Sequence, residues 1–172
     1  MAEPLATARL DLIPLRPEDA GEMVDVLANV RLYAFTGGGP PSREELLARY
    51  ERQSVGRSAD GSEVWLNWII RLRPRGDAIG YVQATVSGSR GPADIAWVIG
   101  VPWQGNGFAA EAARAVVSCL ERGGVSEITA HVHPSHRASE AVAARVGLEA
   151  TDQFEDGERV WRRVAVDINE GA

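Results

Sequence analysis

The sequence has only one cysteine, Cys119, in its 172 residues. A single thiol excludes an intrachain disulfide and a thiol cluster for a structural metal. Cys119 stands beside Leu120 in a predicted helix, where a thiol usually packs as a small apolar group. The chain also lacks an apolar run near the roughly 18 residues of a membrane span and the pattern of a signal peptide. We therefore expect a cytoplasmic protein without a membrane segment.

Basic residues are fewer than acidic ones. The chain has 18 basic and 24 acidic residues, a net charge of −6, which argues against nucleic acid as the main partner. The charge is compatible with a cationic partner such as an amine, but ordinary surface solvation explains a charge of this size better. The length predicts a single domain over residues 1–172.

Histidine is scarce, and a metal site is not predicted. His131 and His133 lie two residues apart, on the same face of a predicted strand, but the sequence has no third ligand with suitable spacing. In that position a lone imidazole is more often a hydrogen-bonded structural group than a base.

The hydrophobic pattern predicts an α+β fold. Strands are predicted over 9–15, 63–72, 78–86, 93–99, 127–133, 149–154 and 159–168, and the apolar residues of 9–15 and 127–133 alternate with the period of two typical of a half-buried strand. Apolar residues at helical spacing begin at Pro17, after the capping box Ser42-x-x-Glu45 and after Gly107. A fourth helical segment ends at Gly147. Three consecutive strands joined by polar turns, with helices before and after them, indicate a meander rather than repeated βαβ units.

The stretch from Val98 to Glu111 carries the strongest functional signal. An apolar strand runs through Gly105, Asn106 and Gly107 into a helix. Backbone N–H groups at such a turn point outward and meet the positive end of the helix dipole, an arrangement that suits a phosphate or diphosphate. A P-loop needs Gly-Lys-Ser/Thr, which is absent, and only two of the three glycines of a dinucleotide fingerprint are present.

The motif Gln104-x-x-Gly107-x-Ala109 resembles the signature of the GNAT superfamily of acyl-CoA-dependent N-acyltransferases. The residues around it are similar to the branch that includes the ribosomal-protein alanine acetyltransferases, and the resemblance extends from Thr7 to Leu148. It implies a single-domain, mixed and mostly antiparallel sheet of six or seven strands with about four helices. In such a sheet, strands four and five splay to admit the cofactor.

The resemblance also implies the cofactor site. Acetyl-CoA would be a co-substrate, and no metal would be needed. Its diphosphate would lie on the backbone of Gln104, Gly105, Asn106, Gly107, Phe108 and Ala109, and its pantetheine arm along Trp97, Val98 and Ile99. The run from Pro134 to Leu148 resembles the second family motif, with His136 where asparagine normally contacts pantetheine and Ser139 at the motif serine.

Transfer of an acetyl group to an amine requires a proton acceptor and a proton donor. Asp94, on the strand that would carry the thioester, is the first candidate base, directly or through water; the alternative is a turn-capping or solvent-facing carboxylate. His131 and His133 are further candidates. Many family members use a helix tyrosine as acid, which is missing, so Ser139 is the substitute that the resemblance allows. The alternative for Ser139 is an N-cap.

The resulting hypothesis is an acetyl-CoA-dependent N-acetyltransferase that acts by direct transfer in a ternary complex. Its acceptor would be a protein N-terminus or a small-molecule amine, which the early helices do not specify. An alternative is a catalytically weak acyl-CoA-binding or regulatory module, and a third hypothesis is a nucleotide-binding protein. Family members are commonly dimers, so the resemblance allows a homodimer.

Overall fold

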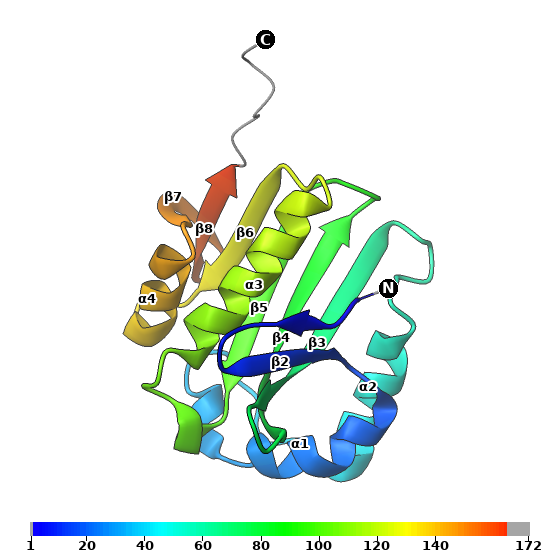
Figure 1. Cartoon of the computed structure of the whole chain (residues 1–172). Coiled ribbons are helices and arrows are strands. Elements are labelled where there is room, and N and C mark those ends of the chain that lie inside the picture. The colour runs from blue at the N-terminus through cyan, green and yellow to red at the C-terminus, as the bar shows by residue number, and fades with distance from the viewer. Residues whose placement is uncertain (1, 165–172) are drawn as a thin grey trace.

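The computed structural model describes residues 2–164. Its centre is one eight-stranded sheet in the order β1-β2-β3-β4-β5-β6-β8-β7 (Figure 1). The strands are β1 (Leu5–Ala6), β2 (Leu10–Pro14), β3 (Glu63–Leu72), β4 (Asp77–Ser87), β5 (Ala93–Ile99), β6 (Glu127–Val132), β7 (Glu149–Glu155) and β8 (Glu158–Val164). The helices are α1 (Ala20–Val26), α2 (Arg43–Ser54), α3 (Phe108–Arg122) and α4 (Arg137–Arg145), with 3-10 turns η1 (Pro17–Asp19), η2 (Val30–Tyr33) and η3 (Val101–Trp103).

Local sequence signals fix the ends of the helices. Ser42 caps α2 by accepting a hydrogen bond from the Glu45 N–H, and the Glu45 side chain accepts one from the Ser42 N–H, which is the predicted capping box. At the other end of the chain, Gly147 follows α4 with a φ of 85°, a left-handed conformation that favours glycine.

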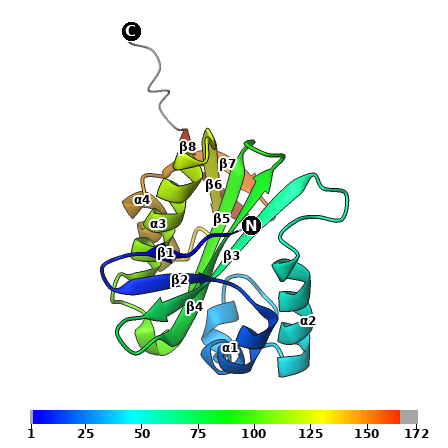
Figure 2. The ribbon, with the colours of Figure 1, turned by 45° about the vertical axis from the view of Figure 1, so that its right-hand side comes forward.

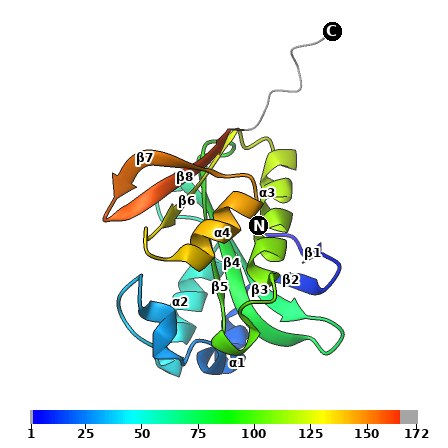
Figure 3. The same ribbon diagram turned by 90° about the vertical axis from the view of Figure 1, so that its left-hand side faces the viewer.

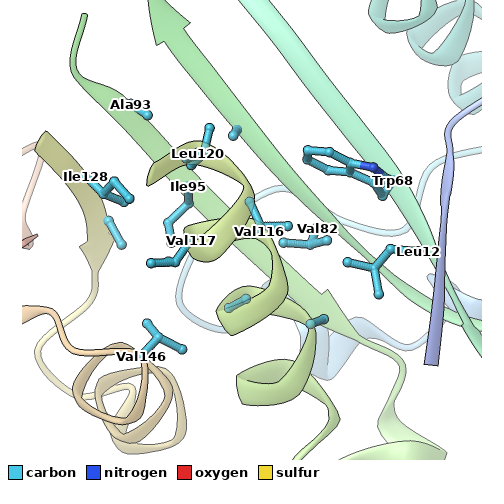
Figure 4. Packing of buried hydrophobic residues seen from close by; sticks show 14 of the residues in the cluster. Leu12, Trp68, Val82, Ala93, Ile95, Val116, Val117, Leu120, Ile128 and Val146 are labelled. Carbon is cyan, nitrogen blue, oxygen red and sulfur yellow. The ribbon is translucent and has the colours of Figure 1, made fainter. Parts of the chain in front are cut away.

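The helices cover the two faces of the sheet. Figure 2 shows α1 and α2 next to each other, and Figure 3 shows α2 and α3 on opposite sides of the strands. On the α3 face, Val116, Val117 and Leu120 pack on sheet residues such as Ile95 and Val82, as Figure 4 shows. The α1 and α2 face holds a second, smaller core around Met23 and Leu46. Successive side chains of β5 therefore point to opposite faces of the sheet: odd-numbered residues face α3, and even-numbered residues face α1 and α2.

The pairing of β5 with β6 creates the gap that the site needs. These two strands are parallel, and they pair only at Ala93 with Ile128 and at Asp94 with Thr129. Since both strands continue for several residues beyond these pairs, their carboxyl ends diverge. This is the predicted splay between the fourth and fifth strands of the family fold, here β5 and β6.

The α+β prediction is confirmed, with eight strands instead of six or seven. The additional strand is β1, whose two residues pair with β2 and are too short to show a sequence period. The last strand was expected over 159–168; its described part ends at Val164, and 165–168 lie outside the described residues. Over residues 2–164, the helices include none with the length and hydropathy required to cross a bilayer.

Candidate active site

The loop before α3 has the geometry of an anion cradle. Gly105 and Gly107 both have a φ of 79°, and Gly107 is the N-cap residue of α3. The loop is braced from within, because Gln104 Nε2 donates to the Ile99 carbonyl at 2.9 Å and Asn106 Nδ2 donates to the carbonyls of Trp103 and Gln104 at 3.1 Å. A Cβ on Gly105 would meet nothing within 4 Å. The cradle therefore faces open space, with the unpaired first N–H groups of α3 beside it.

Two residues that the sequence analysis missed, Arg9 and Glu111, tie this loop to the start of the sheet. Glu111, in the first turn of α3, accepts hydrogen bonds from Thr7 Oγ1 at 2.6 Å, the Arg9 N–H at 3.0 Å and Arg9 Nε at 2.7 Å. Arg9 Nη1 donates to the Asn106 carbonyl at 3.1 Å, and its guanidinium lies 4.6 Å from the centre of the Phe108 ring. Arg9 thus holds the cradle against β2. About 100 residues separate the partners, so no local pattern could have revealed them.

Glu111→Gln is expected to lower the free energy of unfolding by about 2 kcal/mol and Tm by about 4–8 °C, since charge-assisted hydrogen bonds are lost. Burial raises the pKa of Glu111, but the bonds from Thr7 and Arg9 outweigh it and leave the pKa below 4.5. Its stabilising effect is therefore present above that pH and is lost as the pH falls. Thermal unfolding measured at pH 7.5 tests this prediction.

Glu140→Gln is the matched control for Glu111→Gln. Glu140 is also in a first helical turn with 17% of its side chain exposed, but its partner is the highly exposed Arg137 in the same helix. We expect a loss of no more than about 0.5 kcal/mol. Equal Tm shifts for the two variants would contradict the role given to the Arg9–Glu111 pair.

The backbone of β5 faces the gap only at alternate residues. The N–H of Gly100 donates to the Ile79 carbonyl of β4. Hydrogen-bonded residues alternate along an antiparallel pair of strands, so Val98, which lies two residues before Gly100 and opposite Tyr81, also directs its N–H and C=O groups toward β4. Those of Trp97 and Ile99 point the opposite way, toward the gap. Of the three residues expected to pair with pantetheine, two are thus suitably oriented. Val98 instead places its side chain on the α1 and α2 face.

The start of α4 follows the end of β6, the strand on the other side of the gap. His136 is the N-cap residue of α4, without a side-chain capping bond, and Ser139 lies inside the helix. The N-cap alternative for Ser139 is therefore wrong. The Phe35 ring, which the sequence analysis did not single out, stacks on His136 with 4.4 Å between ring centres and lies 5.4 Å from His133. Figure 3 shows this light-blue segment between α1 and α2 beside the loop that follows β6.

Burial between Phe35 and α4 makes His136 sensitive to pH. Burial, and then the nearby His133, lower the pKa of His136 below 6.5. The unfolded chain therefore binds this proton first, and the folded state loses stability as the pH falls below 6.5. We expect His136→Asn to reduce the fall in Tm between pH 7.5 and pH 5.5. Parallel Tm profiles for the two proteins would contradict this prediction.

Asp94 and His131, which were predicted as alternative bases, are hydrogen-bonded to each other across the base of the gap. His131 Nδ1 lies 2.9 Å from Asp94 Oδ1, and Thr129 Oγ1 donates to the same oxygen at 3.2 Å. The other nitrogen, Nε2, lies 3.1 Å from Glu155 Oε2. Asp94 therefore does not cap a turn. His133, the third candidate base, instead accepts a hydrogen bond at Nδ1 from the Ser135 N–H.

The environment of Asp94 favours proton uptake. Its side chain is 46% exposed, yet burial is the largest influence on its pKa and raises it; His131 and Thr129 lower it, Glu155 raises it, and the pKa stays above 3.8. A carboxylate with a raised pKa binds a proton more readily than an ordinary one. Between residues 2 and 164, no group of three or more His, Cys, Asp or Glu side chains has the arrangement of a metal site.

Comparison with known proteins agrees with this geometry. A family model for the acetyltransferase (GNAT) domain matches residues 9–149, from β2 through the cradle to the start of β7. The chain belongs to the GNAT acetyltransferase family. The resemblance found in the sequence, the fold and the class of enzyme are thereby confirmed, whereas the roles of individual residues stay predictions. A search of curated proteins gives no match.

Several solved GNAT structures share the fold. An acetyltransferase from Bacillus anthracis has a TM-score of 0.78 and 14% identity, covering 94% of this chain and 98% of that one. RimL, the ribosomal L7/L12 alpha-N-protein acetyltransferase in complex with coenzyme A, has a TM-score of 0.77 and 14% identity, with the same coverage. Aminoglycoside acetyltransferase AAC(6')-Ib in complex with coenzyme A has a TM-score of 0.73 and 19% identity, covering 90% and 94%. The chain therefore matches these proteins over nearly their whole length.

Proposed function

We propose that this GNAT protein transfers an acetyl group from acetyl-CoA to a primary amine, in a ternary complex and without a covalent enzyme intermediate. The observation that carries the proposal is the cradle of Gln104 to Ala109 next to the diverging ends of β5 and β6. Together they offer donors for a diphosphate and a slot for an extended arm. Relatives that contain coenzyme A, RimL and AAC(6')-Ib, have the same fold.

The backbone of the cradle and of β5 would bind acetyl-CoA, and the Arg9–Glu111 pair would hold the cradle in place. The N–H groups of the cradle would hold the diphosphate, with Arg9 fixing the Asn106 peptide at 3.1 Å. The peptide groups of Trp97 and Ile99 would pair with pantetheine and polarise the thioester carbonyl. His136 and Ser139 would contact the arm from α4. Binding both substrates together replaces a bimolecular encounter, a large part of the rate enhancement.

The Asp94–His131 pair would accept the proton of the amine. The amine nitrogen forms a bond to the carbonyl carbon as the carbon–sulfur bond breaks, and the nitrogen loses one proton while the thiolate gains one. Asp94 would take the amine proton directly or through water, and His131, held at 2.9 Å, lies between Asp94 and the exposed Glu155. Ser139 would hydrogen-bond the departing sulfur.

Glu155→Gln should move the acidic limb of the pH profile of kcat/KM to lower pH. The negative charge of Glu155 raises the pKa of Asp94, so its removal lowers that pKa, and the base stays ionised to a lower pH. The Glu149→Gln variant, changed at an exposed residue of the same strand, should keep the wild-type limb. A limb that stays in place in both variants, or moves to higher pH in Glu155→Gln, would contradict the role of Asp94.

A catalytically weak acyl-CoA-binding module remains the second hypothesis, because His136 replaces the usual asparagine. Detection of thiol release from acetyl-CoA with a panel of primary amines separates the two. We expect amine-dependent release of coenzyme A together with an equal amount of acetylated amine. The chain contains no lysine, so the enzyme adds no side-chain amine to the assay. Tight binding of acetyl-CoA without transfer to any amine would favour the module.

The acceptor and the assembly state belong to the proposal as well. One structural relative is named as a protein α-amine acetyltransferase and another as an aminoglycoside acetyltransferase, so related folds serve both kinds of acceptor. A homodimer and a cytoplasmic location are compatible with this activity. Light scattering at several concentrations tests the first.

A further inference from the structure

A cavity of about 240 Å³ lies between α2 and the sheet. Its inner end is apolar and includes Leu15, Leu27 and Leu46, while its remaining wall includes Arg49, Tyr50, Asn67, Tyr81 and Gln83. A cavity of roughly 150 Å³ holds benzene, so this one takes a molecule of about nine or ten non-hydrogen atoms. Leucine, with an amine, a carboxylate and a branched alkyl group, has this size.

The polar side chains around the cavity are unusual because they lack partners. The hydroxyl of Tyr50, a residue with 3% of its surface exposed, makes no hydrogen bond to any described residue. Asn67 is 8% exposed, and within residues 2–164 neither its amide nor the Gln83 amide has a hydrogen-bond partner. Leaving a buried polar group unpaired costs free energy. The unpaired Tyr50 hydroxyl, in a lining that also holds the amides of Asn67 and Gln83, indicates a ligand that satisfies these groups.

The charge of the lining indicates which ligand this is. Arg49 is the one ionised group among the lining residues, and in the described part of the chain it forms no ion pair. The carboxylate of Asp19, whose charge acts on Tyr50, is already paired with Arg71 at 2.9 Å. Burial raises the pKa of Tyr50, so its hydroxyl stays a donor. A guanidinium and a tyrosine hydroxyl both donate hydrogen bonds to an anionic oxygen, and the charge of the guanidinium repels a polycation.

The cavity shares a sheet face with the proposed catalytic group. Tyr81 and Gln83 of β4 are the register partners of Val98 and Ala96 of β5, and Asp94 follows on the same face because side chains alternate along a strand. One strand spacing, about 4.8 Å, separates the cavity floor from the strand along which the thioester is proposed to lie. A ligand in this cavity therefore has a short path to the reacting carbonyl.

We propose that the cavity binds the acetyl acceptor and that the acceptor is a small amine with a carboxylate, of amino-acid size, whose carboxylate meets Arg49 and Tyr50. The proposal rests on the proposed acetyltransferase activity and adds the class of acceptor. The apolar end around Leu46 takes the alkyl group, and the amine lies on the side of Tyr81 and Gln83. Spermidine and tobramycin, which carry several positive charges, do not match this lining.

The test compares L-leucine, L-leucinamide and 3-methylbutylamine, which share one alkyl group, with spermidine and tobramycin as polycations. We expect kcat/KM for leucine to exceed that for leucinamide by about 10- to 100-fold. Basicity cannot cause this preference, because leucinamide has more of its amine unprotonated. Arg49→Gln should remove the preference because it lowers kcat/KM for leucine and leaves kcat/KM for the other amines unchanged. Arg52→Gln, on the same helix but away from the cavity, should retain it.

Calorimetry in the presence of coenzyme A separates this inference from the activity itself. Leucine binding that is lost in Arg49→Gln but kept in Arg52→Gln supports the inference even without turnover, in which case the proposed function fails alone. If leucinamide or a polycation is the better substrate, or if Arg49→Gln weakens all amines equally, the inference is overturned and the acetyltransferase stands. Absence of leucine binding to the wild-type complex with coenzyme A overturns it too.

Discussion

Asp94→Asn is expected to lower kcat/KM for acetyl transfer by about 10²- to 10⁴-fold, the usual contribution of general acid–base catalysis. Asparagine keeps the shape of the side chain and an oxygen that can accept a hydrogen bond from Thr129, but it does not take up the amine proton. It also removes the charge that holds His131 Nδ1 at 2.9 Å. Steady-state kinetics should show the loss, whereas the Kd for acetyl-CoA measured by calorimetry should stay within about two-fold, since the cradle lies beyond the other end of β5.

Asp152→Asn provides the matched control for this loss of activity. Asp152 is an exposed residue of β7, and its replacement changes the same atoms and the same charge without touching the gap. We expect kinetics within about two-fold of the wild type. An Asp94→Asn enzyme that keeps more than a tenth of wild-type kcat/KM at every pH would show that the amine loses its proton by another route.

Gly107→Val is expected to weaken coenzyme A binding by on the order of 100-fold. Gly107 has a φ of 79° at the N-cap of α3, a conformation that a β-branched residue adopts only under strain. The loop must therefore refold, and its N–H groups no longer converge. Loss of two hydrogen bonds to a charged group, at about 1.5 kcal/mol each, accounts for this factor. Calorimetric titration with coenzyme A measures it.

Gly157→Val separates the loss of affinity from backbone strain. Gly157 also has a positive φ, 85°, with no atom within 4 Å of an added Cβ, but it lies in the turn between β7 and β8. Both variants should lose stability, by about 1–3 kcal/mol, and Gly157→Val alone should keep the wild-type Kd. Similar Kd values for the two variants would mean that the cradle does not hold the diphosphate.

Local signals allowed the elements of the fold to be predicted. The capping box at Ser42, the glycine stop at Gly147 and the alternation of 127–133 each act within a few residues, so the sequence shows them directly. The resemblance to the GNAT superfamily supplied the mixed, mostly antiparallel sheet and the splay, but not the order of the strands. The strand β1 was not predicted because two residues are too few to show a hydrophobic period, and its pairing with β2 is decided by the tertiary structure.

The site was predictable where it depends on backbone conformation and much less so where it depends on tertiary contacts. Gly105 and Gly107 mark the cradle because positive φ favours glycine. The bond between Asp94 and His131 depends on the parallel register of β5 and β6, which the alternation of neither strand reveals. The same holds for the orientation of Val98, for the stacking of Phe35 on His136, and for the convergence of Arg49, Tyr50 and Asn67 on one cavity.

Calorimetric titration of the wild-type protein with coenzyme A, and with pantetheine as the ligand without diphosphate, tests the central claim most directly. The cradle of residues 104–109 predicts that coenzyme A binds at least about 100-fold more tightly, since pantetheine lacks the charge that the N–H groups hold. Equal affinities for the two ligands, or no heat of binding with coenzyme A, would contradict the claim.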